Sequence, residues 1–486
     1  MQFYSLQSIV FLIVIFIIYW IIPKRYFKIQ NILLLLANYG FYALWDWRFL
    51  SLVVLITLLN YLIGNAISNS VHASTRKLYL VINIIVHISL IGFFRYYNFF
   101  IGSLIKSFSL FGVSISINFM KIILPLGISI FTLQGLSYTF DIFRQKLQPS
   151  KDIIAFFAYV SFFPQIIIGP IERATSLLPQ FFRERIFCFE NLESAMRRIL
   201  WGIFKITVIA NNCAIYSNEV FANYSDYSGF TIFVGLLFFV FQLYTDFSGL
   251  TDIATGIAKL FGFDLGPNFK FPFFSRNIAD FWTKWNISLM AWIKEYVYYP
   301  MGGTNGTLWL KFRNLFVLFL LIALWHGGNG LFIVFAFVNA IFVLPNVLRT
   351  NIFKVPLRDK SKVFSGFFEV FRYLFTFILI LVGFTFFGAE TINDAKHIIQ
   401  HLFTNFFYVS ILELRSLGNS FALTLSHSVI LIIYVIFEWV YREKNYALDF
   451  DNNKSSNQTK WMLTGFILIL VLFFNGPAQD DQFFLI

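Results

Sequence analysis

Charged residues and cysteines are scarce in this sequence of 486 residues. Asp, Glu, Lys and Arg make up 13% of the chain, whereas hydrophobic residues make up 58% and the mean hydropathy is +0.71. Soluble domains carry about 25% charged residues, so this composition excludes a soluble enzyme and indicates a chain that lies mostly in lipid. The two cysteines, Cys188 and Cys213, exclude a disulfide framework, and neither has the CxxC spacing of a zinc or thiol redox site.

Metal-binding and nucleic-acid-binding patterns are also missing. His397 and His401 have the i, i+4 spacing that can hold a metal on one helix face, but no carboxylate or cysteine completes a ligand set in the local sequence. We therefore expect no metal. The net charge of +12 comes mostly from Lys and Arg in polar loops, and no basic patch is interleaved with aromatic residues. We expect contacts with membrane lipid headgroups and none with nucleic acid.

Apolar stretches long enough to cross a bilayer recur from end to end. They lie at about 6–22, 29–45, 50–66, 78–94, 122–142, 153–169, 198–216, 229–246, 312–325, 330–347, 369–388, 425–441 and 461–475. Because some of them can be re-entrant or interfacial helices, we predict about ten to thirteen spans. The expected fold is an all-α polytopic membrane protein, with a single transmembrane domain over residues 1–486 and its helices arranged around a central polar tunnel.

His326 is the first candidate for chemistry, because it closes an apolar stretch and precedes a glycine-rich break at residues 327–330. If its helix begins near Arg313, His326 lies roughly 20 Å into a hydrocarbon core of about 30 Å. An ionisable side chain at that depth is costly and marks a functional site by default. The alternative is a histidine that packs between helices, which is the role we expect for His87 and His427.

The most charged and aromatic segment between the apolar stretches is 270–303. Asn277 is a plausible N-cap with Asp280 three residues on, so we expect a helix that begins there and carries Asn286 within its third turn. One stripe of that helix would hold Trp282, Asn286, Leu289 and Ile293. This stripe would turn Asn286 toward the protein. The alternative is an interfacial amphipathic helix with its tryptophans anchored at the membrane surface.

Several motifs occur together in a fixed order. Residues 281–292 read FWTKWNISLMAW, and forty residues separate Asn286 from His326, which lies in WHG. The others are WDWR at 45–48, PLGIS at 125–129, FFPQ at 162–165, GPIER at 169–173 and YTDFSG at 244–249. Over most of its length the chain resembles the membrane-bound O-acyltransferase (MBOAT) family, most closely the bacterial branch that contains the membrane subunit of alginate O-acetyltransferase. In that branch the position of Asn286 is usually histidine.

The residues fit acyl transfer on chemical grounds as well. Moving an acyl group from a thioester to a hydroxyl needs a base for the proton and a donor for the developing oxyanion. His326 is the expected base, since imidazole titrates near neutral pH, and Asn286 would either orient the imidazole or polarise the thioester carbonyl. No serine or cysteine beside His326 forms a nucleophile elbow, so direct transfer is favoured over an acyl-enzyme.

The resemblance implies an O-acetyltransferase of the bacterial inner membrane. The expected donor is acetyl-CoA as a substrate, with no bound cofactor, and the expected acceptor is a hydroxyl of a cell-envelope polysaccharide such as alginate. A separate periplasmic protein is expected to receive or place the acetyl group. The residues expected to line the substrate path are Trp325, Trp282, Asp246, Ser248 and Tyr296.

Two other hypotheses about the function remain at this point. A proton-coupled transporter or channel would use His326 as a relay, and paired charges within several spans would support it. Such charges are scarce in the sequence, although Asp141, Asp246 and Asp252 flank apolar helices. The other alternative is an acyltransferase that acts on a lipid or a teichoic-acid-type acceptor and draws on a carrier-protein thioester.

Overall fold

A computed structural model describes residues 6–112, 122–166, 168–327, 330–352, 365–404, 406, 421–450 and 457–477. Every regular element in these ranges is a helix, which confirms the predicted all-α class. The chain divides into two compact units. Unit 1 comprises Met1–Ala195, Ala254–Gly266 and Asp481–Ile486, and unit 2 comprises Met196–Ile253 and Pro267–Asp480. Two helices, α8 (Phe189–Phe204) and α10 (Gly229–Leu260), have residues in both units.

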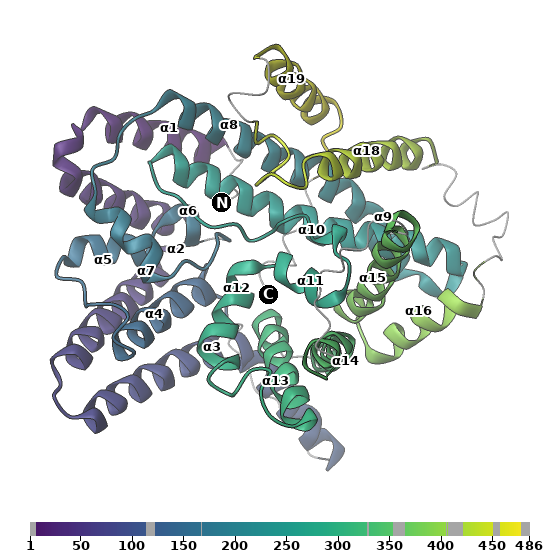
Figure 1. Ribbon diagram of the computed structural model, residues 1–486, viewed down its shortest axis with the longest axis horizontal. Coiled ribbons are helices and arrows are strands. Elements are labelled where there is room, and N and C mark those ends of the chain that lie inside the picture. Colours follow the sequence, from purple (N-terminus) through teal and green to yellow (C-terminus); the bar gives the residue numbers. More distant parts are fainter. Residues whose placement is uncertain are drawn as a thin grey trace. The chain divides into compact units, whose positions relative to one another are not determined.

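Unit 1 is built around one long helix, α2, against which α3, α4 and α5 pack (Figure 1). Its elements in chain order are α1 (Leu6–Ile21), η1 (Lys24–Tyr26), α2 (Phe27–Asn69), α3 (Ala73–Leu110), α4 (Ile128–Phe143), α5 (Ile153–Val160), α6 (Phe163–Ile166), α7 (Ala174–Leu177) and η2 (Leu178–Phe182). The predicted stretch 153–169 is thus a pair of short helices. The break falls after Val160, where Ser161 donates its backbone N–H to Phe157 and the helix does not resume until Phe163.

The WDWR motif marks a kink in α2. Asp46 has non-helical dihedrals, with φ −161° and ψ 107°, in the middle of the helix. The Arg48 guanidinium donates to both carboxylate oxygens of Asp46, at 2.9 Å from Nε and 2.6 Å from Nη2. This bidentate pair stabilises the bend. The predicted spans 29–45 and 50–66 are therefore the two arms of one kinked helix.

Buried amides hold the helices of unit 1 together. Asn60 on α2 donates toward His87 on α3, with 3.1 Å between Nδ2 and Nε2, and Asn83 donates to Thr139 on α4 at 2.8 Å. Gln134 on α4 reaches Gln165 of the FFPQ motif at 3.1 Å. His87 is fully buried, so it has the packing role that the sequence predicts for it.

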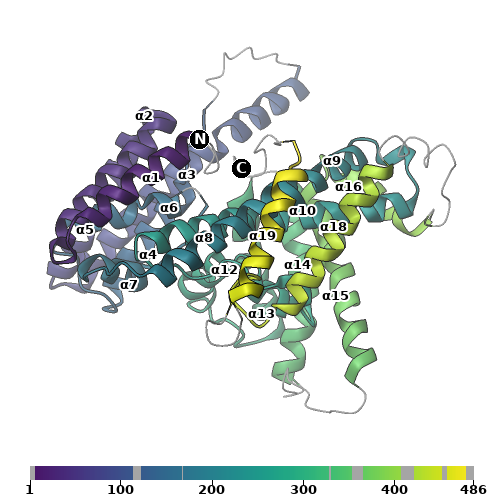
Figure 2. The same cartoon turned by 90° about the horizontal axis from the view of Figure 1, so that it is seen from above.

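Unit 2 contains the candidate site. Its elements in chain order are η3 (Lys205–Ala210), α9 (Asn211–Ala222), η4 (Tyr224–Asp226), η5 (Pro272–Phe274), α11 (Ile278–Lys284), α12 (Ile287–Ile293), η6 (Lys294–Tyr298), α13 (Leu308–His326), α14 (Gly330–Ile352), α15 (Ser365–Gly388), α16 (Ile392–Thr404), α18 (Phe421–Val440) and α19 (Asn457–Phe473). Helices α13, α14 and α15 pack in succession (Figure 1), and α18 and α19 both contact η3. Figure 2 shows α18 and α19 in a second view.

Seven helices in the described part of the chain are long and apolar enough to cross a membrane, so the chain is a multi-pass membrane protein. Four shorter apolar helices, at Leu6–Ile21, Ile153–Ile166, Ser426–Val440 and Gln458–Phe473, add to them. The count of ten to thirteen spans and the central polar tunnel stay predictions.

Candidate active site

His326 is the last residue of α13, a helix of 19 residues. The helix begins at Leu308, earlier than the predicted start near Arg313, because the hydroxyl of Thr307 caps it by accepting the backbone N–H of Leu310 at 3.4 Å. Its far end is closed by Gly327, whose N–H donates to Ala323 at 3.0 Å. Gly328 and Asn329 of the predicted glycine-rich break lie outside the described residues.

Aromatic rings surround the His326 imidazole. Its centroid lies 4.8 Å from the ring of Trp325 and 4.9 Å from that of Phe387, both edge-on, and 6.4 Å from Phe332. The side chain is half-buried. The edge-on arrangement of Trp325 and Phe387 is one of the geometries that aromatic pairs prefer, so the three rings pack the imidazole from several sides.

The same cluster of rings reaches the segment that carries Asn286. Phe387 on α15 contacts Phe384 at 6.0 Å, and Phe384 contacts Trp285 at 5.1 Å. The chain of contacts from His326 thus ends on the residue that precedes Asn286. Trp282 belongs to this cluster too, through Phe335 at 6.1 Å, and its indole N–H donates to Asn339 on α14 at 3.1 Å.

Asn286 does not lie on the continuous helix that the sequence predicts. The predicted N-cap is confirmed, since the Asn277 side chain accepts the N–H of Asp280 at 2.9 Å. Helix α11 then ends at Lys284, Trp285 is extended, and Asn286 is left-handed, with φ 43° and ψ 55°. A non-glycine residue in this region costs on the order of 1 kcal/mol, least for Asn or Asp. The predicted stripe through Asn286 is therefore wrong, because α12 starts afresh at Ile287.

An irregular segment at residues 268–270 holds the break between α11 and α12 in place. The N–H of Ile287 donates to the carbonyl of Asn268 at 2.8 Å, and the N–H of Lys270 donates to the carbonyl of Lys284 at 3.0 Å. These two bonds clamp the ends of α11 and α12 to residues 268–270. Asn286 itself is buried, with 6% of its surface exposed, so the break places an amide inside the protein between two short helices.

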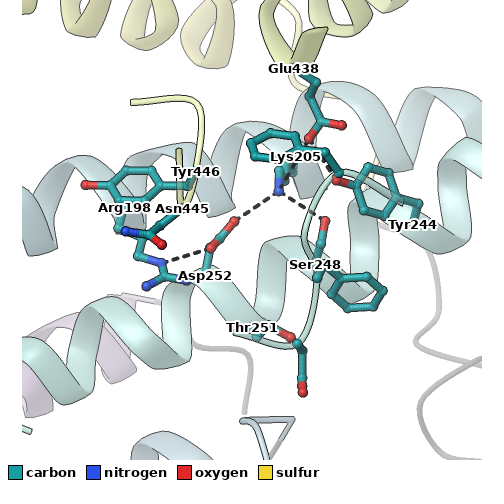
Figure 3. A pocket seen from close by; sticks show the side chains of 12 residues that line it. Arg198, Lys205, Tyr244, Ser248, Thr251, Asp252, Glu438, Asn445 and Tyr446 are labelled. Carbon is teal, nitrogen blue, oxygen red and sulfur yellow. Dashed lines mark hydrogen bonds and ion pairs between the residues drawn. The ribbon is translucent and has the colours of Figure 1, made fainter. Parts of the chain in front are cut away.

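A cluster of four charged side chains, three of them buried, lies elsewhere in unit 2 (Figure 3). The Lys205 ammonium donates to Ser248 at 3.2 Å and Asp252 at 3.0 Å, and lies 3.9 Å from Glu438. Arg198 donates to the other oxygen of Asp252 at 2.9 Å. Three of these residues are on α8, η3 and α10, and Glu438 is on α18. Although charges are scarce in the sequence, this cluster pairs Lys205 and Glu438 from two of the predicted spans with Asp252 and Arg198.

Close helix packing brings these charges together. A Cβ on Gly202 would lie 2.5 Å from the carbonyl oxygen of Gly249, and one on Gly249 would lie 2.8 Å from that of Gly202. Small residues at such a crossing let two membrane helices approach. Lys205, the first residue of η3, lies three residues after Gly202, and Ser248 and Asp252 flank Gly249 on α10. The YTDFSG motif therefore supplies Gly249 of the crossing and Ser248, one of the partners of Lys205.

The predicted substrate-path residues fall into different environments. Trp325 and Trp282 belong to the ring cluster of His326, whereas Ser248 belongs to the charged cluster. Tyr296 is buried on η6 against Trp292, with 5.0 Å between their rings. Asp246 is half-buried on α10. These residues do not form one continuous lining in the described structure.

Sequence reasoning missed Lys205 and Glu438, although a signal was present. Each lies inside a stretch that the sequence predicts to span the membrane, at 198–216 and 425–441, where a charge is expensive unless it is paired. It also missed Asn339, the partner of the Trp282 indole.

Outside the long apolar helices, burial lowers the pKa of Lys294 on η6.

Comparison with known proteins decides the family. The model of the membrane-bound O-acyltransferase family matches residues 39–389. This chain belongs to that family. The match includes parts of both units and every motif that carried the resemblance, and it makes the protein an O-acyltransferase.

Three of the relatives are named for O-acetylation of alginate, O-acetylation of peptidoglycan and D-alanylation of teichoic acid. "Probable alginate O-acetylase AlgI" of Azotobacter vinelandii is 33% identical over 389 residues, which cover 80% of this chain and 74% of the relative. "Peptidoglycan O-acetyltransferase" of Helicobacter pylori is 30% identical, over 76% of this chain and 72% of the relative. "Teichoic acid D-alanyltransferase" of Bacillus subtilis is 27% identical over 45% of this chain and 58% of the relative.

Proposed function

We propose that this MBOAT protein transfers an acetyl group from acetyl-CoA across the inner membrane to hydroxyls of a cell-envelope polysaccharide. His326 is the general base, and Asn286 orients the imidazole or polarises the thioester carbonyl. The observation that carries the proposal is the cluster of rings that holds His326 at one end and Trp285, next to Asn286, at the other.

The reaction needs no covalent enzyme intermediate. An imidazole nitrogen of His326 takes the proton of the acceptor hydroxyl as its oxygen attacks the thioester carbonyl carbon. The new C–O bond forms, the C–S bond breaks, and the proton passes to the departing thiolate, which leaves as the free thiol of coenzyme A. A fixed amide donor near the carbonyl oxygen is worth most in a site that excludes water. Burial of Asn286 and the rings around His326 fit that requirement.

The acceptor is proposed by analogy with the relatives. Two relatives that the alignment covers over more than 70% of their length are named for O-acetylation of alginate and of peptidoglycan. These names favour a carbohydrate hydroxyl as the acceptor. The shorter match to a teichoic acid D-alanyltransferase keeps a carrier-bound donor and a teichoic-acid-type acceptor as the second candidate. In either case we expect a periplasmic partner to receive or place the group.

One observation favours a carrier as a further candidate. The buried cluster of Lys205, Asp252 and Glu438 is the kind of paired charge found along ion paths in transporters. A transporter would move its solute without breaking a thioester. Thioester cleavage therefore separates the two classes.

Mass spectrometry of envelope glycans from cells with and without this chain tests the proposal, because it identifies the transferred group and the acceptor together. We expect acetyl esters on a polysaccharide that disappear when the chain is deleted and do not return with His326→Ala. D-alanyl esters would favour the teichoic-acid alternative. Identical ester content in the two strains would exclude an envelope acetyltransferase.

A further inference from the structure

Asn268 has an unusual place in unit 2. It lines the cavity beside the charged cluster, together with Lys205, Ser248 and Glu438. Only 2% of its surface is exposed, yet its side-chain oxygen has no hydrogen-bond partner among the described residues. A buried amide oxygen without a donor is costly. The side-chain oxygen of Asn268 therefore needs a hydrogen-bond donor that is bound in the cavity.

The cavity limits what that donor can be. Its volume is about 20 Å³, which gives room for about one or two water molecules. The formal charges that line it balance, because Arg198 and Lys205 face Asp252 and Glu438. A balanced cavity does not attract an anion or a cation, so a small neutral donor fits it best.

Asn268 is also tied to Asn286 through the main chain. Its carbonyl accepts the N–H of Ile287, the residue after Asn286, at 2.8 Å. On the other side of Asn286, Trp285 contacts Tyr244, a second residue of the cavity wall, with 6.0 Å between the rings. Both neighbours of Asn286 are thus held by residues that line the same cavity.

We propose that this cavity binds structural water that joins the Asn268 amide to the Lys205 cluster, and that Asn268 thereby acts as a positioning residue for Asn286. The bound water donates to the Asn268 oxygen and accepts from a donor of the cluster. The buried charges would then contribute to acyl transfer without contacting the substrate. They hold the water and Asn268 in place, and the main chain of Asn268 binds Ile287, next to the left-handed Asn286.

This inference rests on the proposed role of Asn286, but one measurement is independent of activity. Asn268→Leu keeps the size of the side chain and removes the acceptor. By hydrogen–deuterium exchange of the purified full chain, we expect the peptide around Ile287 to exchange about tenfold faster in Asn268→Leu. Asn268→Ser keeps an acceptor and should exchange like the wild type. The matched control is Asn212→Leu, since Asn212 is a buried amide that bonds Phe474 at the end of α19.

The second measurement is thiol release at saturating acetyl-CoA. We expect Asn268→Leu to lower kcat about tenfold with little change in KM for acetyl-CoA, Asn268→Ser to stay within about threefold of wild type, and Asn212→Leu to leave kcat per folded molecule unchanged. A high-resolution map should show water density at hydrogen-bond distance, about 2.7–3.2 Å, from the Asn268 oxygen.

The outcomes separate this inference from the proposed function. Unchanged exchange near Ile287 and unchanged kcat in Asn268→Leu would overturn the positioning role, and a cavity that is dry in the map would overturn the water. If Asn286→Ala had full activity while Asn268→Leu sped up exchange, the role of Asn286 would fall and the structural coupling would stand.

Discussion

At the scale of single residues, His326 differs from His87 and His427 in what surrounds it. His87 is enclosed by the amides of Asn60 and Asn83, and His427 meets the hydroxyl of Tyr216 at 3.3 Å. These are contacts of packing residues. The imidazole of His326 packs against the aromatic rings of Trp325, Phe387 and Phe332.

Replacing His326 should abolish transfer without unfolding the protein. We predict that His326→Ala lowers thiol release from acetyl-CoA by on the order of a hundredfold, the usual loss for a general base. The side chain is only half-buried, so the amount of folded protein in the membrane should be close to wild type. His397→Ala, on an exposed face of α16, is the control and should keep full activity. A fully active His326→Ala enzyme would remove the base from the mechanism.

Asn286 combines a backbone role with a side-chain role, and substitutions can separate them. Glycine adopts the left-handed conformation freely but has no amide. We predict that Asn286→Ala and Asn286→Gly both lower kcat, by on the order of a hundredfold if the amide polarises the carbonyl. Asn286→His should recover part of the rate, since an imidazole N–H can donate a hydrogen bond in place of the amide. Wild-type kcat in Asn286→Gly would leave only the backbone role.

At the scale of helices, the crossing of α8 and α10 leaves no room for a larger side chain. Gly249→Ala would drive a methyl group into the carbonyl of Gly202. We predict a loss of about 1–3 kcal/mol in the free energy of unfolding, the usual cost of overpacking. Thermal unfolding in detergent measures it. Gly465→Ala on α19 is the matched control, because nothing lies within 4 Å of its added Cβ, and equal stability of the two variants would contradict the close crossing.

Removing one member of the charged cluster should lower the free energy of unfolding, and removing its partner as well should restore part of that loss. Lys205→Met leaves Asp252 and Glu438 buried without their ammonium, and removing one member of a buried pair costs about 3–5 kcal/mol. The double variant Lys205→Met with Glu438→Gln removes one stranded carboxylate, so it should regain part of the stability. Chemical unfolding of the three proteins measures this, and a double variant less stable than Lys205→Met alone would show that Lys205 does not compensate Glu438.

Local signals predicted helices well and their interruptions poorly. The apolar stretches and the cap at Asn277 follow from neighbouring residues, and the structure confirms the cap and the helical character of most of the stretches. The break at Asn286 depends on bonds to residues 268–270, which no local pattern encodes. The charged cluster needs Lys205, Asp252 and Glu438, which are far apart in the sequence and meet only after the helices pack. Each charged residue could be identified in the sequence as unusual for an apolar stretch, but which of them pair could not be predicted.

At the scale of the whole molecule, acyl transfer and solute transport give opposite results in one assay. We predict that the purified chain, with its partner and acceptor, consumes acetyl-CoA and releases one free thiol for each ester formed. His326→Ala in the same assay is the control for background hydrolysis. Proton or solute flux into vesicles that depends on His326, with no thiol released, would instead establish a carrier.

The six buried residues of η3 form a π-helical turn between α8 and α9. Such a turn holds one residue more than an α-helical turn would, and turns of this kind are frequent at functional sites. Deleting a single residue there would restore α-helical winding and leave the faces of α8 and α9 close to their present register, whereas deleting one residue from α9 itself would rotate every later residue of that helix by about 100°. A one-residue gap in a relative would therefore mean loss of the widened turn if it fell within η3, and a reorganised interior if it fell a few residues later.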